Sequence, residues 1–139
     1  MKALSLWQPW ASLIAIKAKS IETRSWYTSY RGELLICAAK TMNTPYRDYY
    51  YSLPVIPMLS ESDPVPFEDL PRGKAVAKVR LVNCVKITQE LIYKTPENEK
   101  LVGDWKVGRF AMILDEIQAI EQPFYVKGQQ GIFEVDFNG

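Results

Sequence analysis

The chain contains no histidine and only two cysteines, Cys37 and Cys84. Without histidine, Ser-His-Asp and Cys-His catalysis and histidine-ligated zinc are all excluded. Both cysteines lie in apolar stretches, so we expect buried, reduced thiols. If the chain is an enzyme, its proton carriers must be Lys, Glu, Asp, Tyr or Cys, and we expect neither a metal nor a cofactor.

The sequence also lacks a long hydrophobic run and a large net charge. No apolar stretch approaches the roughly 20 residues of a membrane-spanning helix. The region after Met1 does not have the pattern of a secretory signal. We therefore expect a cytoplasmic protein with no membrane contact.

Lys and Arg number 17 against 16 Asp and Glu, giving a formal net charge of +1. Proteins that coat long nucleic acid duplexes are usually far more basic. Any contact with nucleic acid must therefore come from a local cluster of positive charge.

What the sequence does contain is the composition of a folded domain, with 47% hydrophobic residues over 139 positions. We interpret 1–139 as a single domain. A helix is expected from Pro9 to about residue 17, with further short helices near 45–51 and 88–93 and a polar loop through 94–104. Alternating or buried apolar patterns predict strands over 2–6, 21–26, 33–39, 74–87, 108–115, 117–127 and 132–137. Together these elements predict a mainly β, α+β fold, a small barrel of five to six strands with two or three short helices.

Residues 42–72 differ from the rest of the chain. They hold six of the nine prolines. Beyond the helix near 45–51, we predict an irregular surface excursion over this range. It could be a functional loop or a plain insertion.

The densest polar cluster consists of Lys19, Glu22 and Arg24. If 21–26 is a strand, Glu22 and Arg24 share one face with Trp26, and Lys19 lies within reach of Glu22. A lysine beside a carboxylate can hold a phosphate or a polar substrate, and the pair can transfer a proton. The alternative is a solvated face with ordinary ion pairs.

Two further segments carry candidate ligand contacts. Trp7 and Gln8 lie at a strand-to-helix corner, where an indole could stack on a base and an amide could read its edge. The alternative is that the indoles of this corner pack in the core. We expect the two roles to be divided, with Trp10 packed and Trp7 or Gln8 near a cleft.

Lys127 and Gln130 lie on a Gly-bounded turn whose backbone N–H groups could face an anion. Arg109, at a strand start, is an ambiguous candidate.

These motifs together resemble the ASCH family, named for homology to the activating signal cointegrator. The resemblance starts with the segment 4–14 and the family hallmark Gly-x-Lys-x-x-Glu-x-Arg, in which Lys19, Glu22 and Arg24 match the last three fixed positions. Lys17 stands where the family has Gly, which allows a backbone conformation that Lys does not easily copy. Further matches are the segments 30–32, 70–73, 108–110 and 126–131, with Glu99, Gly103 and Pro123.

The resemblance implies a PUA-like β-barrel with a cleft lined by the hallmark residues, and a proline-rich insertion at about 42–72. Members are regarded as RNA-binding or coactivator-associated modules. Some short bacterial relatives are amidohydrolases that deacylate acylated cytidine with Lys, Thr and Glu. Glu22 stands where those enzymes have Thr, and Glu99 is a candidate for their second acid.

We carry three hypotheses forward from the sequence. The first is a binding module, favoured as a monomer, that takes RNA or a modified nucleotide in a basic cleft formed by Trp7, Gln8, Lys19, Glu22, Arg24, Arg109, Lys127 and Gln130. The second is a metal-independent amidohydrolase acting on acylated cytidine or a related nucleoside, in which Lys19 polarises an amide or attacks it and Glu22 or Glu99 manages protons. The third is a protein-interaction module that uses the segment 42–72.

Overall fold

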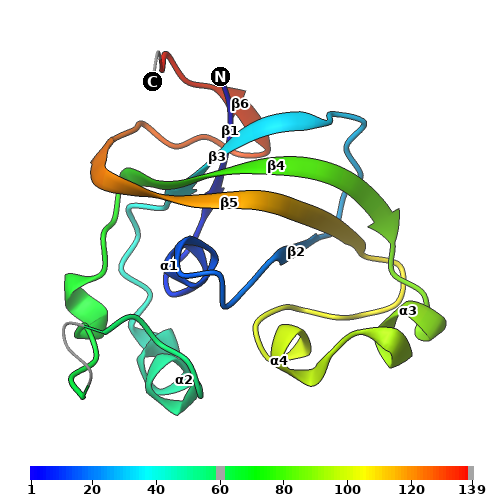
Figure 1. The fold of residues 1–139 in the computed structure, drawn as a ribbon, viewed down its shortest axis with the longest axis horizontal. Helices are drawn as coiled ribbons and strands as arrows, with labels where there is room; N and C mark the ends of the chain where they lie inside the picture. The colour runs from blue at the N-terminus through cyan, green and yellow to red at the C-terminus, as the bar shows by residue number, and fades with distance from the viewer. Residues whose placement is uncertain (59–61, 138–139) are drawn as a thin grey trace.

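The computed structural model describes residues 1–58 and 62–137. Its centre is a six-stranded sheet in the order β2-β5-β4-β3-β1-β6 (Figure 1). The strands are β1 (Lys2–Leu6), β2 (Ile21–Arg24), β3 (Gly32–Ala38), β4 (Lys74–Lys86), β5 (Phe110–Tyr125) and β6 (Ile132–Glu134). β1 pairs with β3 in parallel, and the other neighbouring pairs are antiparallel.

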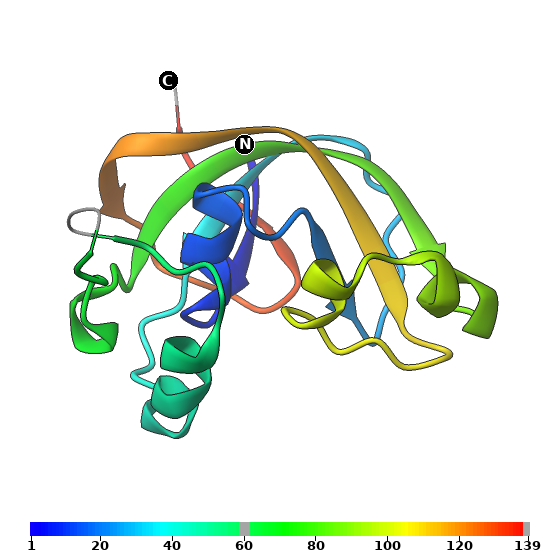
Figure 2. The same cartoon turned by 60° about the horizontal axis from the view of Figure 1, so that its bottom comes forward.

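The helices are short and lie outside the sheet. They are α1 (Trp10–Ala15), α2 (Arg47–Ser52), α3 (Gln89–Lys94) and α4 (Glu97–Lys100), with 3-10 turns η1 (Thr44–Tyr46) and η2 (Phe67–Asp69). The two long strands β4 and β5 arch over α1, and α2 and α4 lie on the same side of the sheet (Figure 2). The curled sheet thus forms a half-barrel with few short helices, which confirms the expected PUA-like fold.

The curvature of the sheet comes with irregular pairing between β4 and β5. The register shifts at three places along this pair. At one of them Glu116 adopts a φ of 49°, so that β5 carries two residues opposite Val79 alone. Such bulges bend a strand and increase its twist. They let one long strand curl over the helices below it.

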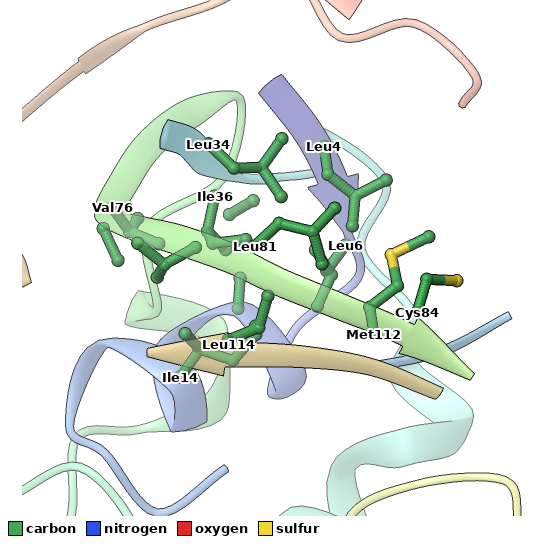
Figure 3. Packing of buried hydrophobic residues seen from close by; sticks show 14 residues of the cluster. Leu4, Leu6, Ile14, Leu34, Ile36, Val76, Leu81, Cys84, Met112 and Leu114 are labelled. Atoms are coloured by element: carbon green, nitrogen blue, oxygen red, sulfur yellow. The ribbon is translucent and has the colours of Figure 1, made fainter. Parts of the chain in front are cut away.

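The core fills the space between the concave face of the sheet and α1. Its largest cluster joins Leu4 and Leu6 of β1 with Leu34 and Ile36 of β3, and adds Leu81 of β4 (Figure 3). Ala11 and Ile14 of α1 close the cluster and are fully buried. The alternation of side chains along each strand sends the remaining apolar residues to the opposite face. There a second cluster includes Leu35, Cys37 and Phe133.

In residues 42–58 and 62–72, the helix expected near 45–51 is present as η1 and α2. After α2 the described residues are mostly irregular, as predicted, apart from the short turn η2. The segment builds a small cluster of its own from Tyr50, Phe67 and Leu70. The Tyr50 hydroxyl donates to the carbonyl of Val65 at 2.7 Å. Burial raises the pKa of Tyr50 to about 12, in keeping with a phenol that packs inside this cluster.

Several predicted element boundaries were wrong. The strands expected over 108–115 and 117–127 are one strand, β5, because the break at Glu116 is a bulge. Pro123 lies in another irregular stretch of the same strand, where its missing N–H interrupts no ladder bond. β2 ends at Arg24, two residues early. The polar loop expected over 94–104 contains α4.

Both cysteines are buried and unpaired, as predicted. Within the described ranges, no helix has the length and apolar character needed to cross a bilayer.

Candidate functional site

A cavity of about 930 Å³ opens below the sheet. We call it the Trp7 cavity. Several separate parts of the chain line it. They are the end of β1 with the start of α1, β2 with Trp26, Ala39 after β3, Tyr46 and Tyr49, the loop after α4 with Arg109, and the turn 129–131. In Figure 1, α1, α2 and α4 all lie below the long strands β4 and β5, with α2 beneath α1 and α4 to its right.

One side of the Trp7 cavity is aromatic. Trp10 contacts the Tyr46 ring edge to face at 4.8 Å and stacks on Tyr49 at 5.5 Å between centroids. Trp7 lies 6.0 Å from Tyr46 and is 47% exposed. Trp10 is therefore locked by its neighbours, while Trp7 keeps an open face. This is the split between a packed and an accessible indole that the sequence suggested.

The other side is polar and is built on β2. Glu22 and Arg24 point to the same face because they are two residues apart on a strand. The Arg24 Nε donates to Glu22 Oε2 at 2.9 Å, and its Nη2 donates to the carbonyl of Ser5 at 2.8 Å. The Arg24 guanidinium also lies 6.0 Å from the Trp26 ring centroid. Arg24 is thus held in one orientation, with its charge at the cavity.

Lys19 lies behind Glu22. Its side chain is fully buried and is not part of the cavity lining. The Nζ donates to the carbonyls of Ile21 at 2.7 Å and Val102 at 2.5 Å, and it lies 3.3 Å from Glu22 Oε1. An ammonium group has three N–H donors, so these three acceptors use all of them. Lys19 therefore holds Glu22 in place and ties β2 to the loop after α4.

Glu99 has a similar supporting role. It is buried, and its carboxylate accepts from the backbone N–H groups of Ser20 and Ile21, the latter at 2.9 Å. These contacts attach α4 to the start of β2. Glu99 is not among the residues that line the Trp7 cavity.

Arg109 lines the cavity and stabilises the loop after α4. Its Nη2 donates to the carbonyl of Thr23, and its Nε donates to the carbonyl of Asp104, both at 3.2 Å. The backbone N–H of Asp104 in turn donates to the Thr23 hydroxyl at 3.0 Å. Asp104 also lines the cavity, and its carboxylate lies 3.6 Å from the Arg109 Nε.

Two predicted ligand contacts lie elsewhere. Gln8 is buried, and its amide donates to the Ser12 hydroxyl and the carbonyl of Pro71, both at 2.8 Å, and accepts from the Ser12 N–H at 3.0 Å. Its contacts are those of a residue that fixes the start of α1. Lys127 lines a neighbouring cavity instead, whereas Gln130 lines both. The structure thus brings together Trp7, Glu22, Arg24, Arg109 and Gln130, with Lys19 directly behind.

The sequence named Gly103 only as a match to the family and did not indicate that residues 101–104 line the site. This segment is joined to β2 by contacts across about 80 residues of chain, such as Lys19 with Val102, which a local pattern does not reveal. Within the described residues, no group of three or more Cys, Asp or Glu is placed to hold a metal ion.

Comparison with known proteins identifies the family of this chain. The family model of the ASCH domain matches residues 4–125. The chain belongs to the ASCH family. Human activating signal cointegrator 1 is 32% identical over 134 residues, and the mouse protein is 31% identical over the same length. The match covers 96% of this chain but 22% of those relatives, so the chain spans about a fifth of their length.

Solved ASCH structures share the fold. The crystal structure of ASCH from Zymomonas mobilis superposes with a TM-score of 0.56 at 16% identity, covering 90% of this chain and 73% of that one. A point mutant of the same protein gives the same TM-score at 14% identity, covering 90% of this chain and 75% of that one.

The structure also shows which backbone conformation Lys17 adopts, at the position where the ASCH hallmark has glycine. Lys17 is exposed and has a φ of 66°, in the left-handed region that favours glycine. Lys17 therefore adopts, at the position of the hallmark glycine, a backbone conformation that glycine adopts without strain.

Proposed function

We propose that this ASCH domain binds single-stranded RNA or a nucleotide by taking a base into the Trp7 cavity. The observation that carries the proposal is the pairing of an open indole face with a fixed carboxylate and guanidinium across one cavity. A volume of about 930 Å³ is in the range of sites for small molecules. The near-zero net charge fits a ligand that is held mainly by its base.

The aromatic side supports stacking. Single-stranded RNA is recognised mostly by bases that stack on aromatic side chains, at about 1–3 kcal/mol per base. Trp7 has an accessible face, and its neighbour Tyr46 is itself held by Trp10. Rigid aromatic groups lose little conformational entropy when they bind a ligand.

The polar side supports recognition of the base edge. Glu22 accepts hydrogen bonds, which suits the exocyclic amino and ring N–H groups of bases, and Arg24 donates to ring nitrogen and carbonyl acceptors. Both side chains are fixed before a ligand arrives, Glu22 by Lys19 and Arg24 by the carbonyl of Ser5. A base that is unpaired exposes this edge, whereas a base in a duplex does not.

The amidohydrolase alternative has less support. Its proposed nucleophile, Lys19, is enclosed by three acceptors and does not line the cavity. Its candidate second acid, Glu99, binds backbone N–H groups of β2 and the residue before it. Neither group is placed to meet a substrate that occupies the Trp7 cavity.

The proposal is tested by titrating the protein with a single-stranded RNA hexamer and with the same sequence as a duplex, followed by fluorescence anisotropy. The single strand is expected to bind and the duplex to bind far more weakly. Trp7→Ala should weaken binding about tenfold or more, because stacking by one base is lost. Glu22→Gln should weaken it by a similar factor and change the preference among bases.

Two control variants match these changes outside the cavity. Tyr93→Ala removes an aromatic side chain that is 87% exposed, and Glu121→Gln neutralises an exposed carboxylate on β5. Both should bind like the unaltered protein. Equal binding of Trp7→Ala and Tyr93→Ala, each folded by circular dichroism, would refute the assignment. Release of cytidine from acetylated cytidine would instead favour the hydrolase.

A further inference from the structure

A second cavity of about 770 Å³ lies beside the first. We call it the Arg72 cavity. Its lining includes Lys40 after β3, Arg72 before β4 and Lys127 after β5. Among the described residues, no Asp or Glu lines it. Within residues 1–58 and 62–137, Lys40, Arg72 and Lys127 form no salt bridge with a carboxylate. The cavity is therefore locally basic in a protein whose net charge is only +1.

Arg72 is the recessed member of this group. Its guanidinium lies 4.7 Å from the Phe67 ring centroid, and Nη1 donates to the carbonyls of Phe67 at 3.0 Å and Leu70 at 3.2 Å. Its Nε and Nη2 are buried and have no hydrogen-bond partner within the described ranges. Burial lowers the pKa of Arg72. A charge removed from water without a counter-ion is costly, and an anion placed nearby offsets that cost.

The turn after β5 supplies further donors. The backbone N–H groups of residues 127–130 form no hydrogen bond within the described part of the chain, and all four residues line the Arg72 cavity. Free N–H groups in a turn can bind an anion that lies against them. Lys40 and Lys127 are exposed and line the same cavity, so their ammonium groups are available to an anion there.

The two cavities are adjacent. Ser5, Ala39, Gln129 and Gln130 line both of them. At this boundary the backbone of Gly128 packs against Ser5, since a Cβ on Gly128 would lie 3.3 Å from the Ser5 Oγ. A phosphate linked to a base in the Trp7 cavity therefore has to pass beside these shared residues to reach the Arg72 cavity.

We infer that the Arg72 cavity is a phosphate subsite, in which Lys40, Lys127 and the 127–130 backbone bind the phosphate attached to the nucleoside in the Trp7 cavity. Arg72 acts through its charge from behind, because its free nitrogens are covered. This inference rests on the proposed function and adds to it. The ligand is a phosphorylated nucleotide or a strand of RNA, not a free nucleoside.

The test compares two ligands that differ only in charge. The four homodinucleotides are titrated by calorimetry, and the tightest is compared with its methylphosphonate analogue, which has the same bases and a neutral linkage. The natural dinucleotide should bind about tenfold more tightly, the difference expected of hydrogen bonds to a charged group. Its affinity should also fall with added salt more steeply than that of the analogue.

Variants locate the effect. Lys40→Gln with Lys127→Gln should bring the affinity ratio of the two ligands close to one and leave the affinity for the analogue unchanged. The control, Lys86→Gln with Lys94→Gln, removes two exposed lysines outside both cavities and should keep the ratio. Equal affinity for the two ligands, or an equal effect of the control pair, would overturn the phosphate subsite alone. Failure of both ligands to bind would overturn the proposed function.

Discussion

Lys19 is the side chain on which the geometry of the site depends most. It is fully buried, and its three acceptors lie on β2 and on the loop after α4. The sequence pattern identified Lys19, Glu22 and Arg24 as a cluster but did not reveal which of them faces the cavity. Lys19 is turned away from the cavity by its bond to the carbonyl of Val102, which lies 83 residues further along the chain.

Replacing Lys19 with Met keeps the length of the side chain and removes its charge. The two carbonyls lose a donor, and the largely buried Glu22 keeps Arg24 as its single charged partner. We expect Lys19→Met to lower the free energy of unfolding by about 3 kcal/mol, as for other broken buried pairs. Urea denaturation at pH 7 measures this. The control, Lys106→Met, changes a lysine side chain that is 77% exposed and should stay within about 0.5 kcal/mol of the unaltered protein. Equal stability of the two variants would contradict the role given to Lys19.

Lys17 shows the opposite case, a side chain that the local backbone does not favour. A non-glycine residue in the left-handed region costs about 1–2 kcal/mol, and Lys17 has a φ of 66°. Lys17→Gly should therefore raise the free energy of unfolding, by about 1 kcal/mol after the entropy cost of glycine. Lys17→Ala removes the same charge and keeps the Cβ. A comparison of thermal unfolding should show a gain for Gly and none for Ala; a gain for both would mean that charge, not strain, is responsible.

Helix α4 illustrates how a very short element becomes fixed. Four residues do not form a stable helix alone, and α4 depends on Glu99, which accepts from the N–H groups of Ser20 and Ile21. The sequence predicted a loop here because the segment is polar and has no apolar period. The helix exists through one carboxylate that contacts another part of the chain.

Removing that carboxylate should loosen α4 and the start of β2 together. Glu99→Ala leaves two largely buried N–H groups without an acceptor and should cost about 2 kcal/mol. Hydrogen exchange of the Ser20 and Ile21 amides should accelerate more than exchange in β3. Glu97→Ala is the matched control, since that side chain is 85% exposed. Unchanged exchange at both amides in Glu99→Ala would show that α4 is held by other contacts.

The strands were predictable where their pattern is simple. β1 and β3 follow the expected ranges closely because apolar residues there alternate or run continuously. β5 was not, because a bulge at Glu116 and a proline at 123 look like strand ends in a sequence. Only pairing with β4 shows that the strand continues through both.

For the molecule as a whole, the sequence indicated the half-barrel and five of the residues that line the Trp7 cavity, namely Trp7, Glu22, Arg24, Arg109 and Gln130. The ASCH hallmark placed Glu22 and Arg24 on one face of a strand, and the Trp7 corner supplied the accessible indole. Whether each of these side chains is buried or exposed could not be predicted, because Lys19 and Gln8 are buried by segments that are far away in sequence. The division into the Trp7 cavity and the basic Arg72 cavity required the packing of the whole chain.

The indole resonances of the four tryptophans test the central claim most directly. Trp7, Trp10 and Trp26 line the Trp7 cavity, and Trp105 does not. Trp105 instead donates through its Nε1 to the carbonyl of Glu99 at 3.3 Å. In ¹H–¹⁵N spectra recorded during a titration with single-stranded RNA, the indole signals of Trp7 and Trp26 should shift most, while that of Trp105 stays nearly fixed. A titration that leaves the Trp7 and Trp26 signals unmoved while RNA binds would contradict the account.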